Sequence, residues 1–325
     1  VMGFGCNVPA IMATRTIENR NNRILTMLIT PFMSCSARLP IYILIIGAFF
    51  PTHASSMLFT IYMLGILMAI GTALIFKRTF FKSDDVPFVM ELPPYRIPTV
   101  RSTLRHMWHK GSQYLRKMGG VILIAVIFVW ALGYYPRDIK FSKDYDGQIA
   151  TTTSRLTVSS SDSITSIKLQ EQIKILETEK ESERQEQSYL GRVGKFIEPA
   201  IAPLGFDWKM GVSLLAGVTA KEIVVSTLGV LYQAEKDADE HSSTLIGKLQ
   251  NETYKSGAKV GEKVFTPLTA FSFLLFILIY FPCVAVIAAI KKESGSWKWA
   301  AFTIVSTTML AWFVAFSVYQ VGSMF

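Results

Sequence analysis

Three cysteines are the residues of this sequence best suited to bind a metal ion: Cys6, Cys35 and Cys283. Each lies in an apolar stretch, close to a proline or glycine that interrupts a helix. An interrupted helix leaves backbone carbonyls without partners, which a membrane tolerates only where the backbone is buried in protein or lines a wet cavity. Thiolates prefer transition metals to Mg²⁺ or Ca²⁺. The pattern therefore predicts a pathway in which thiols and free carbonyls bind a transition-metal ion weakly enough to release it.

The first cysteine belongs to a segment with three helix-breaking residues: Gly3, Gly5 and Pro9. Asn7 suits the cap before a new helix, and Pro9 suits the first turn of that helix. We expect the Cys6 sulfur, the Asn7 amide and the freed carbonyls to face one cavity. The alternative is a packed kink in which Cys6 is a small hydrophobic residue.

The second cysteine lies among two prolines, two serines and an arginine: Pro31, Ser34, Ser36, Arg38 and Pro40. An arginine near the bilayer centre costs at least about 2.5 kcal/mol, so we expect Arg38 to have a partner or to line a pathway, and we assign it to a gate with both serines. In the alternative, Arg38 snorkels or pairs structurally while the serines bond to carbonyls one helical turn earlier. For Arg38 the structural role is the favoured interpretation, and Cys35 is the better functional candidate.

Two further features lie in the second half of the chain. Cys283 directly follows Pro282, in an apolar segment that corresponds to the one containing Cys35. Lys221 and Glu222 are adjacent within another apolar segment, so they point to different sides of a helix and cannot simply neutralise each other. Ionisable groups inside a membrane are functional candidates, and we assign this pair to a gate. The alternative is a gate held by structural ion pairs.

The elements that must position these residues are apolar segments, several of them near the roughly 20 residues that a bilayer requires: 1–14, 24–50, 57–76, 118–135, 208–231, 266–290 and 299–323. The net charge of +9 is then explained by basic cytoplasmic loops and not by nucleic-acid binding. Three widely spaced cysteines predict reduced thiols instead of a disulfide framework. The chain starts at Val1 inside an apolar stretch, without a signal peptide, which suggests a fragment of a longer protein.

Charge orients these segments. The basic segments 14–23 and 77–117 are predicted to be cytoplasmic, and the polar insert 136–190, with one charged helix at 167–188, is predicted to face outward. Segment 232–265 is slightly acidic and loop 291–298 is basic, which favours a re-entrant hairpin at 208–231.

The two halves then match in order and oppose each other in orientation. We predict an all-α, polytopic membrane protein with two inverted gate-type repeats that contain re-entrant or broken helices. The first repeat covers 1–76, with a broken segment at 1–14 and helices at 24–50 and 57–76. A basic loop with an amphipathic helix (77–117), a transmembrane helix (118–135) and the insert (136–190) follow. The second repeat covers 191–325, with an interfacial segment at 191–207, the hairpin at 208–231 and helices at 266–290 and 299–323.

The sequence lacks the usual signatures of an enzyme. It contains no G-x-x-x-x-G-K-[ST] phosphate-binding loop and no H-E-x-x-H motif, and its four histidines lie in predicted loops or interfaces. His106 and His109 belong to an amphipathic basic stretch that we expect to lie on the cytoplasmic membrane surface. We therefore predict that this chain is not an enzyme.

The motifs together resemble the FeoB family, the bacterial ferrous iron transport protein B. Residues 3–16 (GFGCNVPAIMATRT) and 30–40 (TPFMSCSARLP) are similar to its first gate. Three further motifs resemble the second half of that family: 195–208 (KFIEPAIAPLGFDW), 215–223 (LAGVTAKEI) and 281–283 (FPC). The resemblance covers nearly the whole chain except the insert 136–190.

The resemblance implies a multi-pass bacterial inner-membrane domain that carries Fe²⁺, with Cys6, Cys35 and Cys283 on the iron pathway and Glu222 as the gate acid. It implies that GTP and Mg²⁺ bind only to an N-terminal G domain outside this sequence. The implied partners are the bilayer, that G domain, small cytoplasmic Feo proteins and further copies of the chain. Two other functions stay open: a nucleoside or organic-solute carrier of similar gated architecture, and a non-transporting membrane anchor for a GTPase.

Overall fold

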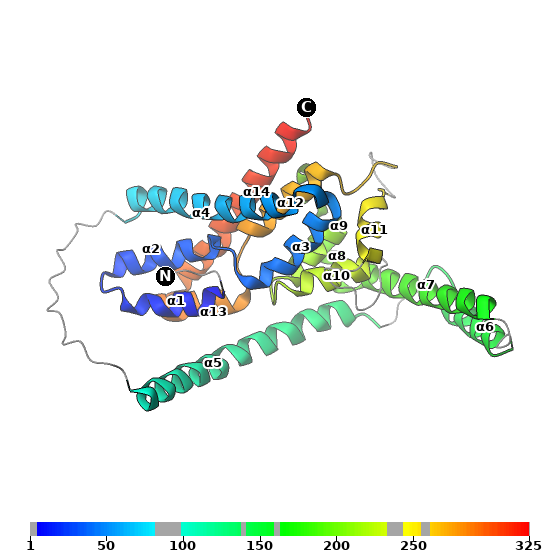
Figure 1. The fold of residues 1–325 in the computed structure, drawn as a ribbon, viewed down its shortest axis with the longest axis horizontal. Coiled ribbons are helices and arrows are strands. Elements are labelled where there is room, and N and C mark those ends of the chain that lie inside the picture. Colours follow the sequence, from blue (N-terminus) through cyan, green and yellow to red (C-terminus); the bar gives the residue numbers. More distant parts are fainter. Residues whose placement is uncertain are drawn as a thin grey trace.

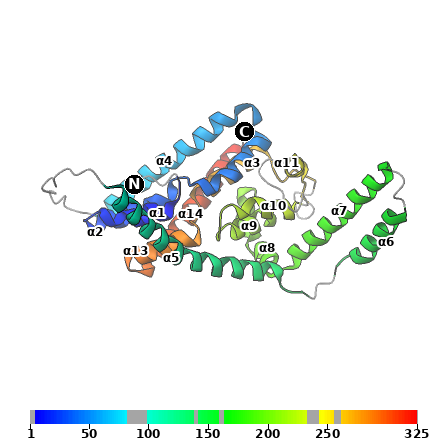
Figure 2. The same ribbon diagram turned by 60° about the horizontal axis from the view of Figure 1, so that its bottom comes forward.

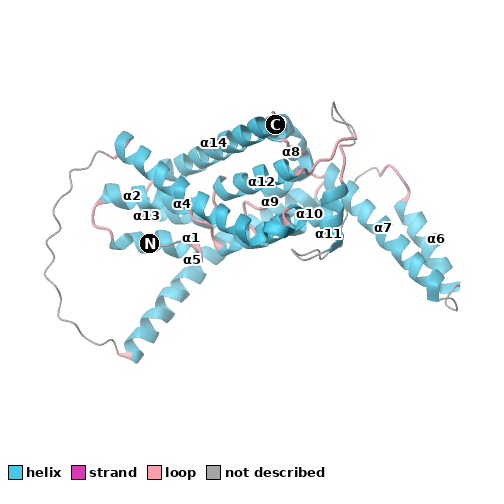
Figure 3. Cartoon of the chain, turned by 45° about the horizontal axis from the view of Figure 1, so that its top comes forward, coloured by secondary structure: helices cyan, strands magenta, loops and turns pink. Residues whose placement is uncertain are grey.

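The computed structural model describes residues 5–81, 99–137, 141–158, 163–232, 243–254 and 261–324, so Gly3 lies outside the described residues. Within these ranges the chain is helical, without a strand (Figure 3). Four helical segments are long and apolar enough to cross a membrane: Arg20–Phe49, Pro51–Thr79, Pro267–Ser294 and Trp297–Gly322. The predicted class of an all-α membrane fold is confirmed.

The first of these segments is broken in its middle. It consists of α2 (Arg20–Ile29), two short 3₁₀ turns, η2 (Thr30–Phe32) and η3 (Ser36–Arg38), and then α3 (Leu39–Phe49). Met33 and Cys35 have extended backbone angles between the two turns. Pro31 and Pro40 lack the N–H groups that a continuous helix would need. The predicted helix 24–50 is therefore two half-helices joined by an extended link.

The third segment is broken in the same way. It comprises α12 (Pro267–Ile279) and α13 (Val284–Ser294), with Tyr280 and Cys283 in non-helical conformations between them. Pro282 lies within this link and cannot donate a helical hydrogen bond. Both extended links thus contain a cysteine, and both lie beside prolines.

The two unbroken spans, α4 (Ala54–Thr79) and α14 (Trp297–Gly322), each have 26 residues and follow a broken span. Their buried residues are mostly small and form one stripe along each helix: Ile61, Gly65, Ala69 and Thr72 in α4, and Ala300, Thr303, Thr307, Ala311 and Ala315 in α14. Small residues let helices approach closely in a membrane. The large apolar side chains on the other faces, such as Phe59, Leu67 and Phe313, are exposed, as expected where lipid replaces water.

Each half also contains shorter helices that precede its broken span. In the first half this helix is α1 (Asn7–Ala13), followed by η1 (Thr14–Thr16). In the second half α8 (Tyr189–Ile201) and η5 (Ala202–Leu204) lead into α9 (Trp208–Ala216) and α10 (Ile223–Leu231), with a turn at 217–222. The last of these shorter helices, α11 (Ser243–Asn251), packs against α3.

Helix α5 (Val100–Tyr134) corrects one predicted boundary. We predicted an amphipathic helix within 77–117 and a separate span at 118–135, but α5 runs unbroken for 35 residues (Figures 1 and 2). Gly119 and Gly120 do not interrupt it, because no proline or polar cap follows them to end the helix. Within α5, Leu123–Tyr134 is a shorter apolar stretch than the four candidate spans.

The insert 136–190 contains two helices where we predicted one. Helices α6 (Tyr145–Val158) and α7 (Ser163–Gln187) pack against each other and project from one end of the molecule (Figure 2). In α6, successive threonine and serine hydroxyls donate to carbonyls one turn earlier, including Thr152 to Gln148 and Thr153 to Ile149. These bonds allow a threonine-rich stretch to be helical although its residues favour other conformations.

The close packing of α4 against the first link gives a testable prediction. A Cβ atom at Gly65 would lie 3.0 Å from the Phe32 carbonyl oxygen, whereas one at Gly71 would meet nothing within 4 Å. We expect Gly65→Val to destabilise the protein by about 1–3 kcal/mol, because overpacking pushes α4 away from the link. The measurement is the thermal midpoint of the purified protein.

Gly71→Val is the matched control, since it makes the same substitution in the same helix and should shift the midpoint much less. Equal midpoints for the two variants would contradict the close approach of α4 to the link.

Candidate functional site

A cavity of about 220 Å³ lies where the two halves of the chain meet. Its walls come from the start of α1, the first extended link, the turn between α9 and α10, and the start of α13. The predicted residues on its lining are Gly5, Cys6, Asn7, Cys35, Ser36, Arg38, Lys221, Glu222, Pro282 and Cys283. The three cysteines, far apart in sequence, thus lie around one cavity. The lining does not include Ser34, Pro9, Pro31 or Pro40.

Each of the three cysteines immediately precedes a helix. Cys6 is the N-cap residue of α1, Cys35 that of η3 and Cys283 that of α13. All three have extended backbone conformations and free thiols, with Cys6 exposed and the other two half-buried. Their common position follows from the breaks, because the residue before a new helix lies at the point where the chain changes direction.

Backbone hydrogen bonds tie each broken span to the short helix of its own half. In the first half the Ser36 N–H donates to the Gly5 carbonyl oxygen at 3.0 Å. In the second half the Val284 N–H donates to the Val218 carbonyl oxygen, also at 3.0 Å. In both cases the donor is the residue that follows the cysteine of the link. These bonds fix Cys35 and Cys283 against the cavity.

The polar residues at the start of α1 and in the first link have different roles. Asn7 is buried, and its Nδ2 donates to the Met33 carbonyl at 3.4 Å while its Oδ1 has no partner among the described residues. The hydroxyl of Ser36 adds a second hydrogen bond to the Gly5 carbonyl, at 2.9 Å. Ser34 is buried and donates to the Tyr42 hydroxyl at 3.3 Å. Within the described ranges neither serine bonds to a carbonyl one turn earlier, so the part of the alternative that concerns the serines is wrong.

Arg38 is 1% exposed and holds the first link together. Its Nη1 and Nη2 donate to the Pro31 carbonyl at 3.3 and 3.2 Å, and Nη1 also lies 3.4 Å from the Met33 carbonyl oxygen. The carbonyls freed by the break are therefore satisfied by a guanidinium group, which has five N–H donors in a rigid plane. This geometry agrees with the structural role that we favoured for Arg38.

Lys221 and Glu222 lie in different environments. Lys221 is 3% exposed, and its ammonium donates to the Phe281 carbonyl at 3.0 Å and lies 3.2 Å from the centre of the Tyr280 ring. Glu222 is exposed. No ion pair joins Lys221 to a carboxylate within the part of the chain that the structure describes, so a gate held by ion pairs at Lys221 is not what the structure shows.

The cysteines do not form a complete metal site in this conformation. In the described ranges, no three His, Cys, Asp or Glu side chains are close enough together to hold one metal ion. The cavity contains partially exposed thiols, free polar atoms and a single carboxylate residue, Glu222. It can offer a metal ion a few ligands at a time, which suits brief contact more than storage.

One tie at the far end of the short helices could not be predicted from the sequence. Arg15, in the turn after α1, forms a two-pronged ion pair with Glu293 near the end of α13, with Nε 2.6 Å from Oε2. Helices α1 and α13 both start at the cavity, so this pair joins their opposite ends. The residues are 278 positions apart, and no local pattern indicates such a partner.

A second tie closes the α9–α10 hairpin. Asp207 caps the start of α9 by accepting from the Met210 N–H at 2.8 Å, and it accepts from the hydroxyl of Tyr232, at the end of α10, at 2.9 Å. The start and end of 208–231 are therefore adjacent, as a re-entrant segment requires. Burial raises the pKa of Asp207 to about 6, against the opposing effect of its hydrogen bonds and of Lys209.

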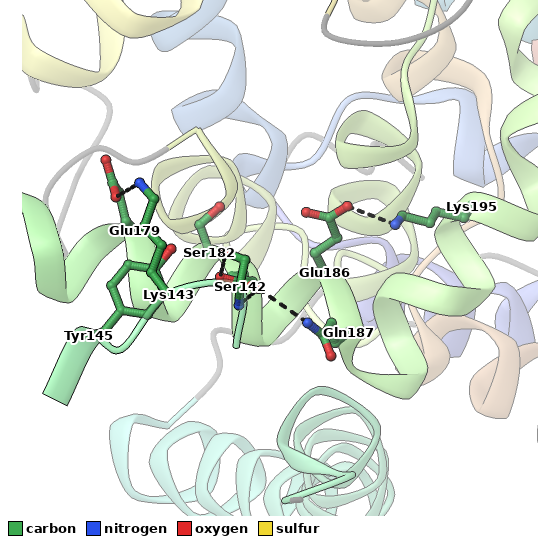
Figure 4. Close-up of a pocket in the computed structure, with 9 residues that line it drawn as sticks. Ser142, Lys143, Tyr145, Glu179, Ser182, Glu186, Gln187 and Lys195 are labelled. Carbon is green, nitrogen blue, oxygen red and sulfur yellow. Dashed lines mark hydrogen bonds and ion pairs between the residues drawn. The ribbon is translucent and has the colours of Figure 1, made fainter. Parts of the chain in front are cut away.

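A larger polar pocket of about 550 Å³ lies between the α6–α7 hairpin and α8 (Figure 4). Its three glutamates already have partners. Glu179 lies 3.6 Å from the Lys143 ammonium, Glu183 accepts from the Ser142 N–H at 2.7 Å, and Glu186 pairs with Lys195 at 2.7 Å. This pocket is a structural joint between the hairpin and the membrane domain, and its acids are not arranged for a metal ion.

Comparisons with known proteins agree with the sequence motifs. A family model described as "Nucleoside recognition" matches residues 1–49 and 115–297, and one described as "Ferrous iron transport protein B C terminus" matches residues 58–110. No solved structure matches.

Several curated relatives are similar over almost the whole chain. A fusion of Fe(2+) transport protein A and Fe(2+) transporter FeoB from Porphyromonas gingivalis is 50% identical over all of this chain and 37% of its own length. The Fe(2+) transporter FeoB of Campylobacter jejuni is 38% identical over 97% of this chain and 44% of its own length. That of Helicobacter pylori is 37% identical over 96% and 46%. The chain thus spans less than half the length of these relatives.

The buried Asp207 carboxyl gives a prediction of pH dependence. Its pKa is raised from 3.8 to about 6, so the folded state keeps the proton over a range in which the unfolded state has lost it. This group therefore contributes stability at low pH that is lost as the pH rises through about 6. We expect Asp207→Asn to flatten this part of the curve of thermal midpoint against pH.

Tyr232→Phe removes a hydrogen bond that stabilises the carboxylate, so the carboxyl pKa should rise further above 6 and the loss of stability should extend to higher pH. Its cost should be about 1.5–3 kcal/mol near neutral pH, where a charged acceptor loses a donor. Tyr189→Phe, at a tyrosine that is 46% exposed, is the control. Parallel curves for Asp207→Asn and the unmodified protein would show that Asp207 is not buried in this way.

Proposed function

The chain belongs to the FeoB family of ferrous iron transport proteins, and we propose that it forms the path by which such a transporter passes Fe²⁺ across the membrane. The observation that carries this proposal is the position of three thiols, Cys6, Cys35 and Cys283, around one cavity at breaks in membrane helices. The relatives named as Fe(2+) transporters support the choice of Fe²⁺ as cargo.

In this mechanism the cysteines act as transient thiolate ligands, one or two at a time. The supporting ligands are the carbonyls at the helix breaks and the Asn7 side chain, whose Oδ1 has no partner in the part of the chain that the structure describes. A half-dehydrated Fe²⁺ ion gains from a thiolate because sulfur suits transition metals. It can leave again because the structure does not bring three such ligands together among the described residues. Weak successive contacts are what conduction requires.

We further propose that the two halves are inverted repeats. The support is the shared order of a short helix, a broken span and an unbroken span of 26 residues in each half. The matching hydrogen bonds, Ser36 to Gly5 and Val284 to Val218, add to it. From the charge distribution of the loops we further propose that the insert lies outside and the basic loops lie inside a bacterial cytoplasmic membrane. The cavity would then lie near the midplane.

GTP has no site in our proposal for this chain. The sequence contains no phosphate-binding loop of the G-x-x-x-x-G-K-[ST] type. The relatives are more than twice as long as their matched parts, so we assign GTP and Mg²⁺ binding to a G domain in the remaining length. The bilayer, that domain, small cytoplasmic Feo proteins and further copies of the chain are the proposed partners.

The nucleoside-carrier alternative is favoured by the description of the matching family model. However, the cavity of about 220 Å³ is smaller than the about 300–1,000 Å³ usual for organic ligands, and it is lined by thiols and two buried basic groups. A membrane anchor without transport would not need a cavity lined by thiols and charged side chains. The cavity thus supports metal transport over both alternatives.

Removing the thiols tests this function. In the full-length protein reconstituted into liposomes, Cys6→Ser or Cys283→Ser should lower Fe²⁺ uptake by about tenfold or more, because a thiolate ligand is replaced by a weak hydroxyl. Membrane abundance should stay unchanged. Wild-type uptake in both variants would refute the cysteine pathway.

Protection from alkylation gives a second readout that does not depend on turnover. Fe²⁺ should slow maleimide labelling of variants that retain Cys6 or Cys283 alone. The control is Ser154→Cys without the three native cysteines, which places a thiol on the exposed surface of α6. Equal slowing at this control position would indicate a general effect of the metal and not binding in the cavity.

A further inference from the structure

A fixed positive charge lies at the second helix break. The Lys221 ammonium, on the turn between α9 and α10, reaches the other broken element of its half and donates to the Phe281 carbonyl at 3.0 Å. Phe281 lies directly before Pro282, in the link where the helical hydrogen bonds end. The ammonium also lies 3.2 Å from the centre of the Tyr280 ring. A carbonyl oxygen and an aromatic face together form a site for a small cation.

This ammonium forms no ion pair with an acid in the described ranges. Lys221 is 3% exposed and has no ion pair with any carboxylate that the structure describes, and the neighbouring Glu222 is exposed. A buried charge normally requires an opposite charge or several hydrogen bonds. Here the attraction comes from the backbone of the link and from the ring. Lys221 is therefore bound by the groups that would otherwise bind a free cation.

The first break repeats the arrangement independently. The guanidinium of Arg38, which is 1% exposed, donates to the carbonyls of Pro31 and Met33, at the end of the first half-helix. It also has no ion pair among the described carboxylates. In each half, then, a side-chain cation occupies carbonyls at the break beside the cavity. Because the same arrangement occurs at both breaks, it indicates a common function, whereas one buried lysine alone would not.

The packing around Tyr280 keeps the ring in place under the ammonium. A Cβ atom at Gly217 would lie 3.0 Å from the Tyr280 hydroxyl and 2.3 Å from a Val224 methyl group, so only glycine lets the turn approach the ring. The hydroxyl itself is buried without a hydrogen-bond partner among the described residues. Close packing therefore holds the ring in place although its buried hydroxyl loses a hydrogen bond. This is consistent with a ring whose role is to bind a cation.

We propose that the Phe281 carbonyl and the Tyr280 ring form a binding site for a small primary ammonium ion, which the Lys221 side chain occupies as a tethered cation. This gate rests on the proposed iron pathway: the tethered ammonium of Lys221 holds the gate of the second half closed. Fe²⁺ reaches the Phe281 carbonyl beside Cys283 only when the ammonium withdraws.

Chemical rescue tests the site without iron. Lys221→Ala removes the atoms from Cγ to Nζ, and propylammonium replaces them. We expect propylammonium to raise the thermal midpoint of the purified full-length Lys221→Ala variant saturably, as a ligand that binds only the folded state does, and not that of the wild type. Trimethylpropylammonium has the same charge without an N–H donor and should have no effect.

Lys291→Ala is the matched control variant, because it also removes a lysine from a ring, with the ammonium 4.4 Å from the centre of Trp297. A midpoint that rises equally in this control, or that does not rise in Lys221→Ala, overturns the inference. Should Lys221→Ala yield no folded protein, recovery of folded protein with and without propylammonium replaces the midpoint, and no gain in recovery overturns the inference equally.

Fe²⁺ uptake by liposomes tests the gate. Lys221→Ala should take up Fe²⁺ faster than the wild type in the absence of nucleotide, and propylammonium should return the rate toward that of the wild type. Uptake that propylammonium leaves unchanged refutes the gate. A wild type that carries no Fe²⁺ while Lys221→Ala still binds propylammonium would refute the proposed function and leave the cation site standing.

Discussion

The structure depends on one constraint: backbone polar groups inside a membrane must find partners within the protein. Two spans are broken, and each break leaves carbonyl and N–H groups that water cannot reach in lipid. The observed hydrogen bonds resolve this need. The Gly5 and Val218 carbonyls accept from the residues after Cys35 and Cys283, and Arg38 and Lys221 satisfy the carbonyls at the breaks. These hydrogen bonds stabilise the breaks, so the half-helices do not join into continuous helices, and the cavity lies at the breaks.

The unbroken spans make this arrangement possible. Broken helices are weaker supports than continuous ones, so they need neighbours that pack closely without adding polar groups. Helices α4 and α14 provide such neighbours with stripes of small residues, and α4 approaches the first link at Gly65. The ties between Asp207 and Tyr232 and between Arg15 and Glu293 then fix the outer ends of the short helices. The cavity residues are thereby positioned by contacts that lie well away from them.

The parts of this structure that the sequence predicts are those set by local chemistry. Prolines beside Cys35 and Cys283 predict the breaks because proline cannot donate a hydrogen bond. The α6 helix was missed because threonine-rich sequence gives a weak helical signal. The partners of Lys221, Asp207 and Arg15 were also missed. Each of these contacts joins segments that are distant in sequence, and one sequence contains no signal for such pairs.

In the proposed function, the charges around the cavity favour conduction of a cation over its storage. Arg38 and Lys221 place two fixed positive charges on its lining, and α13 adds the partial positive charge of a helix start at Cys283. A divalent cation is repelled by these groups in a medium of low dielectric constant, unless a thiolate or Glu222 offsets them. Binding is then a difference between two large opposing effects and is weak. In the proposed function, a small movement of one basic side chain would change the sign of this difference, so a gate could control the passage of a weakly bound cation.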